Sequence, residues 1–232
     1  MRRLVLVLLL LTLCLPSAFA RRKKAKAGTV DKLTFVDDKY QFSLKLLDNW
    51  KYKIGDEEEN VRLTLVQKNY QIPPDYMDAE DYTQVPRIVV WSGETNLSPT
   101  AFVDSLLSDS YDSDQKDDIY KEFELINESS AGSGTYREEL VPKGKKTFEL
   151  DGQQALLWKG YVKYMKEVAL SASSTGGKRV RGAYGGSIVA VKKGQNIVLF
   201  HVICEWQYYP QIESEMMEMV SSLKWPESKP KG

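Results

Sequence analysis

The sequence has very few of the side chains that form disulfides, bind metals or act as catalytic bases. It contains two cysteines, Cys14 and Cys204, and a single histidine, His201. Cys14 falls in an N-terminal segment that we expect to be removed, and one remaining cysteine cannot form an internal disulfide. Stability must therefore come from a packed core. No metal-ligand or cofactor motif is present, so we predict neither a metal nor a cofactor, and no catalytic residue.

The chain also has no excess of charge of either sign. Lys and Arg together number 32, as do Asp and Glu, so the net charge is zero. Loss of Arg2 and Arg3 with the N-terminal segment leaves a net charge of −2. Proteins that bind nucleic acid usually carry a basic excess. We therefore expect no nucleic acid as a partner; a protein partner is expected because the chain is interpreted below as a binding or accessory protein.

No apolar run in the sequence is long enough to cross a membrane as a helix. The run at 4–15 has about a dozen residues, whereas a spanning helix needs roughly 20. It follows two arginines and precedes the small-residue site Ala18-Phe19-Ala20. This order is typical of a secretory signal peptide. We predict a signal peptide over 1–20, cleavage after Ala20, and a periplasmic or extracellular location.

Two features of this N-terminal segment concern alternatives to a cleaved signal peptide, namely an uncleaved membrane anchor and a lipid attached to Cys14. The basic residues at 21–24 lie directly after the apolar run, where positive charge resists export. A membrane-tethered protein with an uncleaved N-terminus therefore stays open as an alternative. Lipidation of Cys14 is not expected, because Leu13 stands where such a site has a small residue.

Short apolar stretches with strand-like patterns predict a sheet through most of the chain. The predicted strands are 33–36, 40–46, 61–66 and 87–91, with hairpins at 147–165 and 187–204. Asp151-Gly152 is a turn pair typical of hairpins, and Gly194 lies in the second turn. Residues 197–204 are apolar at nearly every position, which indicates a strand covered on both faces in the middle of a sheet.

Two segments have the signals of amphipathic helices. Ser98 and Pro99 provide an N-cap and a first-turn residue before an apolar stripe that ends near Asp109. After Pro210, apolar residues recur at helical spacing: Ile212, Met216, Met219, Val220 and Leu223. Together, these elements predict an α+β fold, a twisted and mainly antiparallel sheet with helices on its faces.

The rest of the sequence is polar or irregular. Residues 21–30 are basic, lack apolar periodicity and are predicted to form a disordered leader. A single domain is expected over 31–226, followed by a polar tail at 227–232. Within the domain, 67–86 and 171–186 are predicted to be long loops, the first rich in proline and tyrosine and the second in serine and glycine.

The order of these parts resembles that of a known family. The segments concerned are YQFSLKLLDNWKYKI at 40–54, SPTAFVDSLL at 98–107, LDGQQALLW at 150–158, VKKGQNIVLFHVICE at 191–205 and MVSSLKW at 219–225. Together they resemble the PsbP-like family, which includes the extrinsic photosystem II protein P, a Ran-binding nuclear protein and uncharacterised exported bacterial proteins. The resemblance implies an α/β/α sandwich and no enzyme activity. It carries over no binding residue, because none matches position by position.

Candidate catalytic and ligand residues have little sequence support. His201 lies in the most apolar strand, which favours a buried structural histidine, and Cys204 on the same strand is expected to be a small buried side chain. Ser187 lacks the following glycine of a nucleophile elbow. Residues 175–179 lack the phosphate-loop pattern, and the acidic segment 112–118 lacks the central glycine of a calcium loop. The competing interpretation is a hydrolase or transferase that uses His201 with nearby carboxylates.

The two predicted loops are the expected contact segments of a non-catalytic, exported binding or accessory protein. Connecting loops on a rigid sheet often carry function, and aromatic side chains and arginine are enriched at binding hot spots. Cations in 171–186 are expected to attract an anion or an acidic partner, and tyrosines in 67–86 to supply apolar contact. A solubilising connector is the alternative for the basic segment. The candidate residues are Lys178, Arg179, Arg181, Tyr184, Tyr76 and Tyr82.

Overall fold

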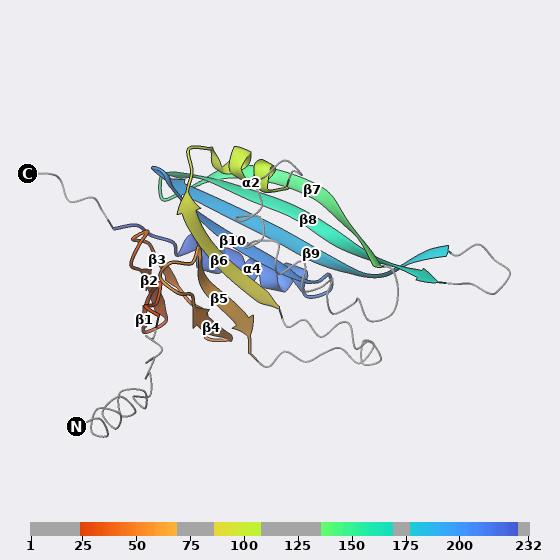
Figure 1. The fold of residues 1–232 in the computed structure, drawn as a ribbon, viewed down its shortest axis with the longest axis horizontal. Coiled ribbons are helices and arrows are strands. Elements are labelled where there is room, and N and C mark those ends of the chain that lie inside the picture. Colours follow the sequence, from red (N-terminus) through yellow and green to blue (C-terminus); the bar gives the residue numbers. More distant parts are fainter. Residues whose placement is uncertain (1–23, 69–85, 108–135, 169–176, 227–232) are drawn as a thin grey trace, which may run out of the picture.

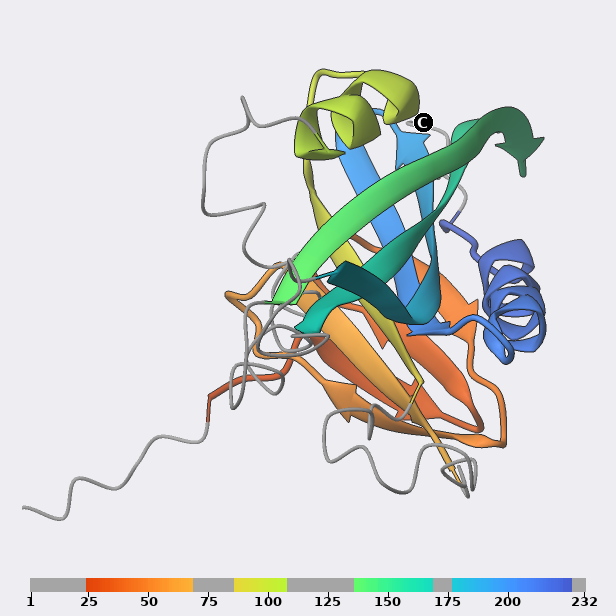
Figure 2. The same cartoon turned by 90° about the vertical axis from the view of Figure 1, so that its right-hand side faces the viewer.

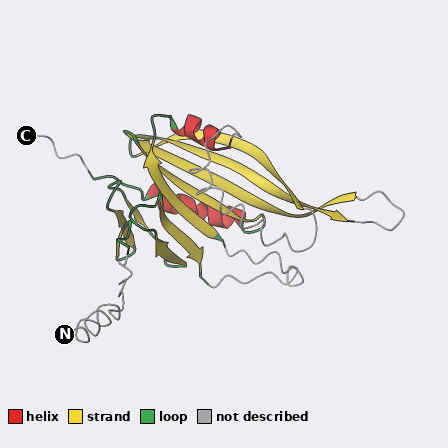
Figure 3. Ribbon diagram, in the orientation of Figure 1, coloured by secondary structure: helices red, strands yellow, loops and turns green. Residues whose placement is uncertain are grey.

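The computed structural model describes residues 24–68, 86–107, 136–168 and 177–226 (Figures 1 and 3). In these residues the chain forms two antiparallel sheets and two helices. The small sheet has the order β1-β2-β3, and the large sheet has the order β4-β5-β6-β10-β9-β8-β7. The elements are β1 (Gly28–Asp31), β2 (Thr34–Asp37), β3 (Ser43–Lys45), β4 (Trp50–Ile54), β5 (Val61–Gln67), β6 (Arg87–Glu94), α2 (Pro99–Leu107), β7 (Tyr136–Leu150), β8 (Gln153–Val168), β9 (Gly177–Lys193), β10 (Asn196–Glu205) and α4 (Tyr209–Ser221).

β10 lies in the middle of the large sheet, between β6 and β9. Its alternate side chains enter two different cores. Val198, Phe200 and Val202 belong to one core, and Ile197 and Leu199 belong to the other. All five side chains are fully buried. The nearly continuous apolar pattern of this strand therefore reflects cover on both faces, as the sequence predicted.

The two helices cover opposite faces of the large sheet. α4 packs Ile212 and Met216 into the first core, whereas α2 packs Phe102 and Leu106 into the second. Figure 2 shows the two helices on different sides of the strands. The first core also contains apolar side chains of the small sheet, such as Phe35. This arrangement confirms the predicted α+β fold with helices on the faces of an antiparallel sheet.

The predicted hairpin turns are confirmed in their position and chemistry. Asp151 and Gly152 connect β7 and β8 and have positive φ angles of 50° and 70°. Two consecutive positive φ angles are the type I′ pattern, whose twist matches that of the flanking strands. Gly194, with a φ of 62°, lies in the turn between β9 and β10. Both turns thus use residues that tolerate a left-handed backbone.

A buried ion pair joins the small sheet to the large one. Arg62 on β5 and Asp37 on β2 have fully buried side chains, and Arg62 Nε donates to Asp37 Oδ2 at 2.6 Å. The other guanidinium hydrogen bonds go to three backbone carbonyl groups, those of Ala27, Glu57 and Glu59. Asp37 Oδ1 accepts two backbone N–H groups from the turn after β2. Both charges therefore have several hydrogen-bonding partners, as burial requires.

The predicted disordered leader needs correction at its end. Gly28–Asp31 forms β1, which pairs with β2, and Ala27 is fully buried. The Ala27 carbonyl oxygen accepts from Arg62 Nη2 at 3.1 Å. Strand pairing and the hydrogen bond from the buried Arg62 hold this segment in place. It can therefore form a strand without an amphipathic pattern that sequence analysis would recognise.

The predicted loop over 171–186 is wrong for its second half. β9 begins at Gly177 and pairs with β8, with Gly186 opposite Gly160. The sequence misleads here because glycine-rich segments usually mark loops. Gly185, however, lies beneath the Tyr209 ring, where a Cβ would come within 2.1 Å of Tyr209 Cγ. Glycine is required at position 185 because the Tyr209 ring packs directly against the backbone of β9 there.

Several predicted features lie outside the described residues. They are the signal peptide at 1–20, most of the 67–86 segment with Tyr76 and Tyr82, the acidic segment 112–118 and the tail at 227–232. These features remain predictions from the sequence. Within the described part of the chain, no helix is both long and apolar enough to cross a membrane.

β7 forms an edge of the large sheet, because among the described strands it pairs with β8 alone. The register shifts between Pro142 and Gly144, and proline has no N–H to offer to a further strand. Lys143, Lys145 and Lys146 lie on the same stretch and are exposed. Proline, a register irregularity and lysines are features that keep an edge strand from pairing with another molecule.

Removing two of these features is expected to promote self-association. The double variant Pro142→Thr/Lys146→Thr restores a donor N–H and removes a charge, which makes β7 a better template for strand pairing. Sedimentation velocity should show larger species than for the parent at equal concentration. The exposed α4 substitution Glu218→Thr is the control and should sediment like the parent. A double variant without larger species contradicts this account of the edge.

Candidate partner-binding surface

An exposed aromatic and cationic surface lies where β10 leads into α4. Trp206, in the connecting turn, is 49% exposed. Its indole stacks on the Tyr209 ring, with centroids 5.8 Å apart and planes 14° apart, and Tyr161 on β8 meets it edge-on with centroids 6.0 Å apart. Lys143 Nζ on β7 lies 4.5 Å from the Tyr161 ring centroid. We call Lys143, Lys159, Tyr161 and Trp206 the Trp206 surface.

The local sequence after β10 places Trp206 at the surface and Tyr209 in the core. β10 ends at Glu205, a turn follows, and α4 begins at Tyr209 with Pro210 in its first turn. Proline suits this position because the first helical N–H groups have no partner within the helix. Tyr209 is buried against Gly185 and joins the core of the α4 face. Trp206 is therefore supported from below by a ring that cannot move without displacing α4.

A mostly buried carboxylate fixes α4 beneath this surface. Glu213 Oε1 accepts from Ser187 Oγ at 2.7 Å and from the Tyr209 hydroxyl at 3.0 Å. Glu213 Oε2 lies 2.7 Å from Lys159 Nζ. The Glu213 side chain is 14% exposed and that of Lys159 is 43% exposed. Lys159 is therefore part of the exposed surface, and the mostly buried Glu213 fixes the position of the Lys159 side chain through their ion pair.

The Tyr209 hydroxyl stays protonated within this cluster. Burial raises the pKa of Tyr209 well above its ordinary value of 10.0; the hydrogen bond with Ser187 lowers this pKa in part, and the negative charge of Glu213 raises it again. A phenol that keeps its proton is a steady hydrogen-bond donor. The cluster therefore has the properties of a structural anchor between α4 and β9.

Ser187 has a carboxylate partner but lacks the access that a nucleophile needs. Its side chain is fully buried, and its Oγ donates to Glu213 and lies in direct contact with the Tyr209 hydroxyl oxygen. A substrate would have to displace the Tyr209 ring to reach this oxygen. The geometry therefore favours a role for Ser187 in packing α4 over a role in covalent catalysis.

His201 lies on the opposite face of the sheet from Ser187. Alternation places His201 with Leu199 on the α2 face, and Ser187 with Val189 on the α4 face. His201 is 3% exposed, and burial lowers its pKa from 6.5 to about 4. It is therefore neutral at neutral pH and does not form a base–nucleophile pair with Ser187. The predicted burial of His201 and of Cys204 is confirmed.

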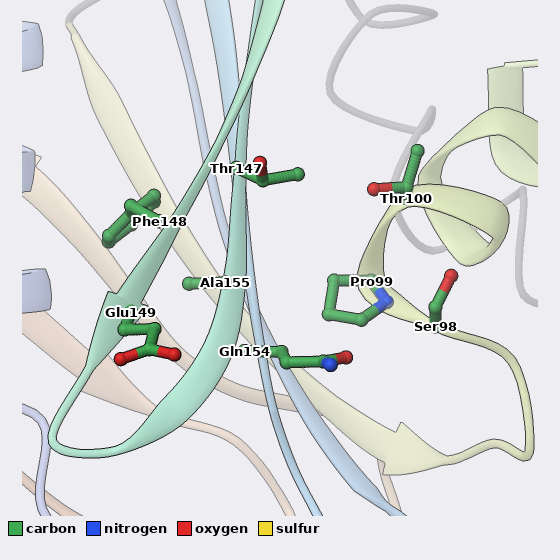
Figure 4. Close-up of a pocket in the computed structure, with 8 residues that line it drawn as sticks. All are labelled: Ser98, Pro99, Thr100, Thr147, Phe148, Glu149, Gln154 and Ala155. Atoms are coloured by element: carbon green, nitrogen blue, oxygen red, sulfur yellow. The ribbon is translucent and has the colours of Figure 1, made fainter.

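A hollow lies on the α2 face, between the start of α2 and the β7–β8 hairpin (Figure 4). Its volume is about 410 Å³. The polar side chains around it are Ser98, Thr100, Thr147, Glu149 and Gln154. One carboxylate among hydroxyl and amide groups makes neither a catalytic pair nor a metal site. Across the described residues, no cluster of three or more His, Cys, Asp or Glu side chains could hold a metal ion.

Four of the six binding residues predicted from the sequence lie on β9, which pairs with β8, the strand that carries Tyr161; the other two, Tyr76 and Tyr82, lie outside the described residues. Gly185 of β9 pairs with Tyr161 of β8, and the next residue toward the start of β9 is Tyr184. Further along, Arg179 pairs with Lys166. The predicted candidates on β9 are Lys178, Arg179, Arg181 and Tyr184. The structure thus places them on an extension of the sheet and not in a loop.

Sequence reasoning missed the Trp206 surface because its residues come from separate elements. Lys143 is on β7, Tyr161 is on β8, and Trp206 is in the turn before α4. No local periodicity connects positions so far apart in the chain. The available signal was a tryptophan in a polar turn just after an apolar strand, where a core residue is not expected.

Comparisons with known proteins bear on the fold. Neither the protein-family models nor the curated proteins yield a match to this sequence. The structure is similar to cyanobacterial PsbP from Synechocystis sp. PCC 6803, with 13% identity, coverage of 86% of this chain and 98% of that chain, and a TM-score of 0.42. It is also similar to LpqN of Mycobacterium tuberculosis, which is involved in cell envelope biogenesis, with 9% identity, coverage of 80% and 83%, and a TM-score of 0.40.

A third similar structure is the Ran-binding protein Mog1p of Saccharomyces cerevisiae. It has 10% identity, with coverage of 80% of this chain and 90% of that chain, and a TM-score of 0.34. A PsbP and a Ran-binding protein are two of the three kinds of protein that the sequence resemblance named. The chain's own sheet order and its helices on opposite faces agree with the α/β/α sandwich that the PsbP-like resemblance implied. Likeness at this level concerns the fold and assigns no partner.

Proposed function

We propose that this protein is a non-catalytic, exported binding protein that contacts a protein partner through the Trp206 surface. The basic residues on the adjoining part of β9 and the tyrosines of 67–86 are included in this proposal as further contacts. Export rests on the signal-peptide pattern of residues 1–20. The periplasm or the extracellular space is thus the proposed location.

The exposed, supported indole of Trp206 is the observation that carries this proposal. Tyr209 and Tyr161 hold the indole in one orientation, so a partner that covers it immobilises few additional rotatable groups. Tryptophan and tyrosine are also the side chains most enriched at binding hot spots. Lys143 and Lys159 border the aromatic rings, which matches the usual arrangement of an apolar centre with a polar rim.

The placement of the reactive side chains supports the absence of catalysis. Ser187 and His201 are both buried, and they lie on opposite faces of the sheet. A hydrolase or transferase would need a nucleophile and a base within hydrogen-bonding reach of each other and of a substrate. The described residues form a rigid surface without a nucleophile and base placed to react with a substrate. Such a surface suits a binding protein.

Site-specific cross-linking is expected to capture a partner at Trp206. The photoreactive residue p-benzoylphenylalanine, placed at position 206, keeps an aromatic ring on the surface and reacts with a protein that covers it. After irradiation of the exported fraction, a defined adduct should appear at this position. The expected adduct is lost when Tyr161→Ala is added, because the edge-on support of the ring is removed.

The matched control places the same photoreactive residue at Tyr52. Tyr52 is 44% exposed, similar to Trp206, but it lies on β4 at the other edge of the large sheet. It should give no defined adduct. Equal adducts at the two positions, or none at position 206, contradict a specific role for the Trp206 surface.

A further inference from the structure

Basic residues of this chain are concentrated in the three strands at one end of the large sheet, β9, β8 and β7. β7, β8 and β9 carry twelve Lys and Arg residues against four Glu residues. The whole chain has a net charge of zero, so the rest of it carries the opposite excess. Three neighbouring strands with such an excess raise the local concentration of anionic groups near them. This segregation is not visible in the overall composition.

These three strands extend beyond the rest of the sheet. β10 ends at Glu205, opposite Tyr184, whereas β8 and β9 continue together to Val168 and Gly177. Figure 1 shows β7, β8 and β9 leaving the body of the molecule as a three-stranded ribbon. The Trp206 surface lies where this ribbon leaves the body, because Tyr161 is the β8 residue that contacts the turn after β10. Its aromatic rings therefore lie at the start of the ribbon, where residues 136–141 of β7, 162–168 of β8 and 177–184 of β9 carry six Lys and Arg against three Glu.

The positions of the two lysines of the Trp206 surface add charge next to the indole. Lys143 is exposed and lies over the outer ring, Tyr161. Lys159 is half-exposed, although Glu213 neutralises it in part. Trp206 is thus flanked by cations on the side of β7 and β8. An acidic segment would gain apolar contact from the indole and attraction from the lysines at the same time.

Recognition at this surface must use side chains and not strand addition. β7 is the edge nearest to the surface, and Pro142, the register shift and the lysines beside it oppose pairing with a further strand. A partner is therefore expected to be recognised through its charge and its apolar side chains. Its backbone would not continue the sheet.

From the charge segregation and its position beside Trp206, we infer that the partner presents an acidic polypeptide segment to the Trp206 surface and to the ribbon of β7, β8 and β9. The inference rests on the proposed function, which makes the partner a protein. It adds the chemical class of the contacting segment. Poly-L-glutamate is a suitable probe because it carries that chemistry without any other recognition element.

The fluorescence of Trp206 provides a direct readout. The other four tryptophans are 9% exposed or less, so a quencher in solution reaches Trp206 almost selectively. On the full-length protein, iodide should quench more strongly than caesium, relative to neutral acrylamide, because Lys143 and Lys159 lie on the β7 and β8 side of the aromatic rings. Poly-L-glutamate should protect Trp206 from acrylamide at low salt, and added salt should remove the protection. Poly-L-lysine should give none.

Charge substitutions locate the binding. Lys178→Gln/Arg179→Gln/Arg181→Gln is expected to weaken the protection by poly-L-glutamate about tenfold and to lower its salt dependence. The control triple, Lys45→Gln/Lys51→Gln/Lys53→Gln, makes the same change in net charge on exposed positions of β3 and β4, away from the ribbon. It should bind like the parent. Circular dichroism confirms that both triple variants are folded.

Several outcomes overturn the inference. Absence of protection at low salt, or equal loss in the two triple variants, shows that the ribbon does not select acidic polypeptides. Stronger protection by phosphatidylglycerol vesicles than by poly-L-glutamate assigns the surface to a lipid instead. A defined adduct at position 206 without any binding of poly-L-glutamate keeps the proposed function and rejects the acidic partner. Binding of poly-L-glutamate without an adduct rejects the proposed function.

Discussion

Replacing Arg62 by methionine is expected to lower the free energy of unfolding by about 3 to 5 kcal/mol, because it leaves the fully buried Asp37 carboxylate without its cation. The backbone carbonyl groups that accept from the guanidinium, including that of Ala27, lose their donor as well. β1 and β2 should therefore separate more easily from β5. Urea unfolding at neutral pH measures the change.

Two further variants show whether the charge itself is responsible. Asp37→Asn/Arg62→Met removes both charges, and the asparagine oxygen can still accept the backbone N–H groups that Asp37 accepts. The double variant should be less destabilised than the sum of the two single variants. Lys26→Met, which breaks an exposed ion pair with Asp56, should change stability little. A loss for Arg62→Met no larger than that for Lys26→Met contradicts the role assigned to the buried pair.

His201 is expected to make the protein less stable as the pH falls from about 6.5 to about 4. Burial lowers its pKa to about 4 in the folded protein, whereas the unfolded chain has the ordinary value of 6.5. Between these values the unfolded chain binds a proton that the folded protein does not bind, so protonation favours unfolding. The total loss is about 3 kcal/mol, and the full stabilisation is present only above pH 6.5.

A variant without a titratable group at this position isolates the effect. Carboxylates also titrate in this range, but they are common to the parent and to His201→Leu and cancel in the difference between them. Urea unfolding at pH 7.5 and 4.5 should show the parent losing about 2 to 3 kcal/mol more than His201→Leu. The same pH dependence in both proteins would mean that His201 is not neutral in the folded state.

The Trp206 surface accounts for features of the chain that packing alone does not require. A core needs no exposed tryptophan, and a sheet edge needs only a few charges to avoid aggregation. β9 nevertheless carries Lys178, Arg179 and Arg181, with no acidic residue, in the part that extends past Gly185. We propose that these residues and the indole at the start of the ribbon together suit this part of the molecule to a partner. The opposite face, around α2, has a polar hollow without such charge.

Local patterns in the sequence were sufficient for the hairpins, both helices and the central strand. The Asp151-Gly152 turn needs only residues that accept positive φ angles, and the α4 stripe of Ile212 and Met216 needs only helical spacing. The near-continuous apolar run of β10 likewise indicates cover on both faces wherever it occurs. These features were predictable because each depends on the chemistry of a few neighbouring residues.

Tertiary structure alone decided the features that depend on contacts between distant residues. β1 forms because Arg62 and β2 provide hydrogen-bonding partners for a segment with no apolar pattern of its own. The glycine-rich start of β9 is a strand because β8 pairs with it and because Tyr209 occupies the space above Gly185. Likewise, Tyr161 and Trp206 become one surface only when β8 and the turn after β10 meet. The local sequence around each of these residues carries no signal for such contacts, because the contacts stabilise the protein only once the folded chain has brought the residues together.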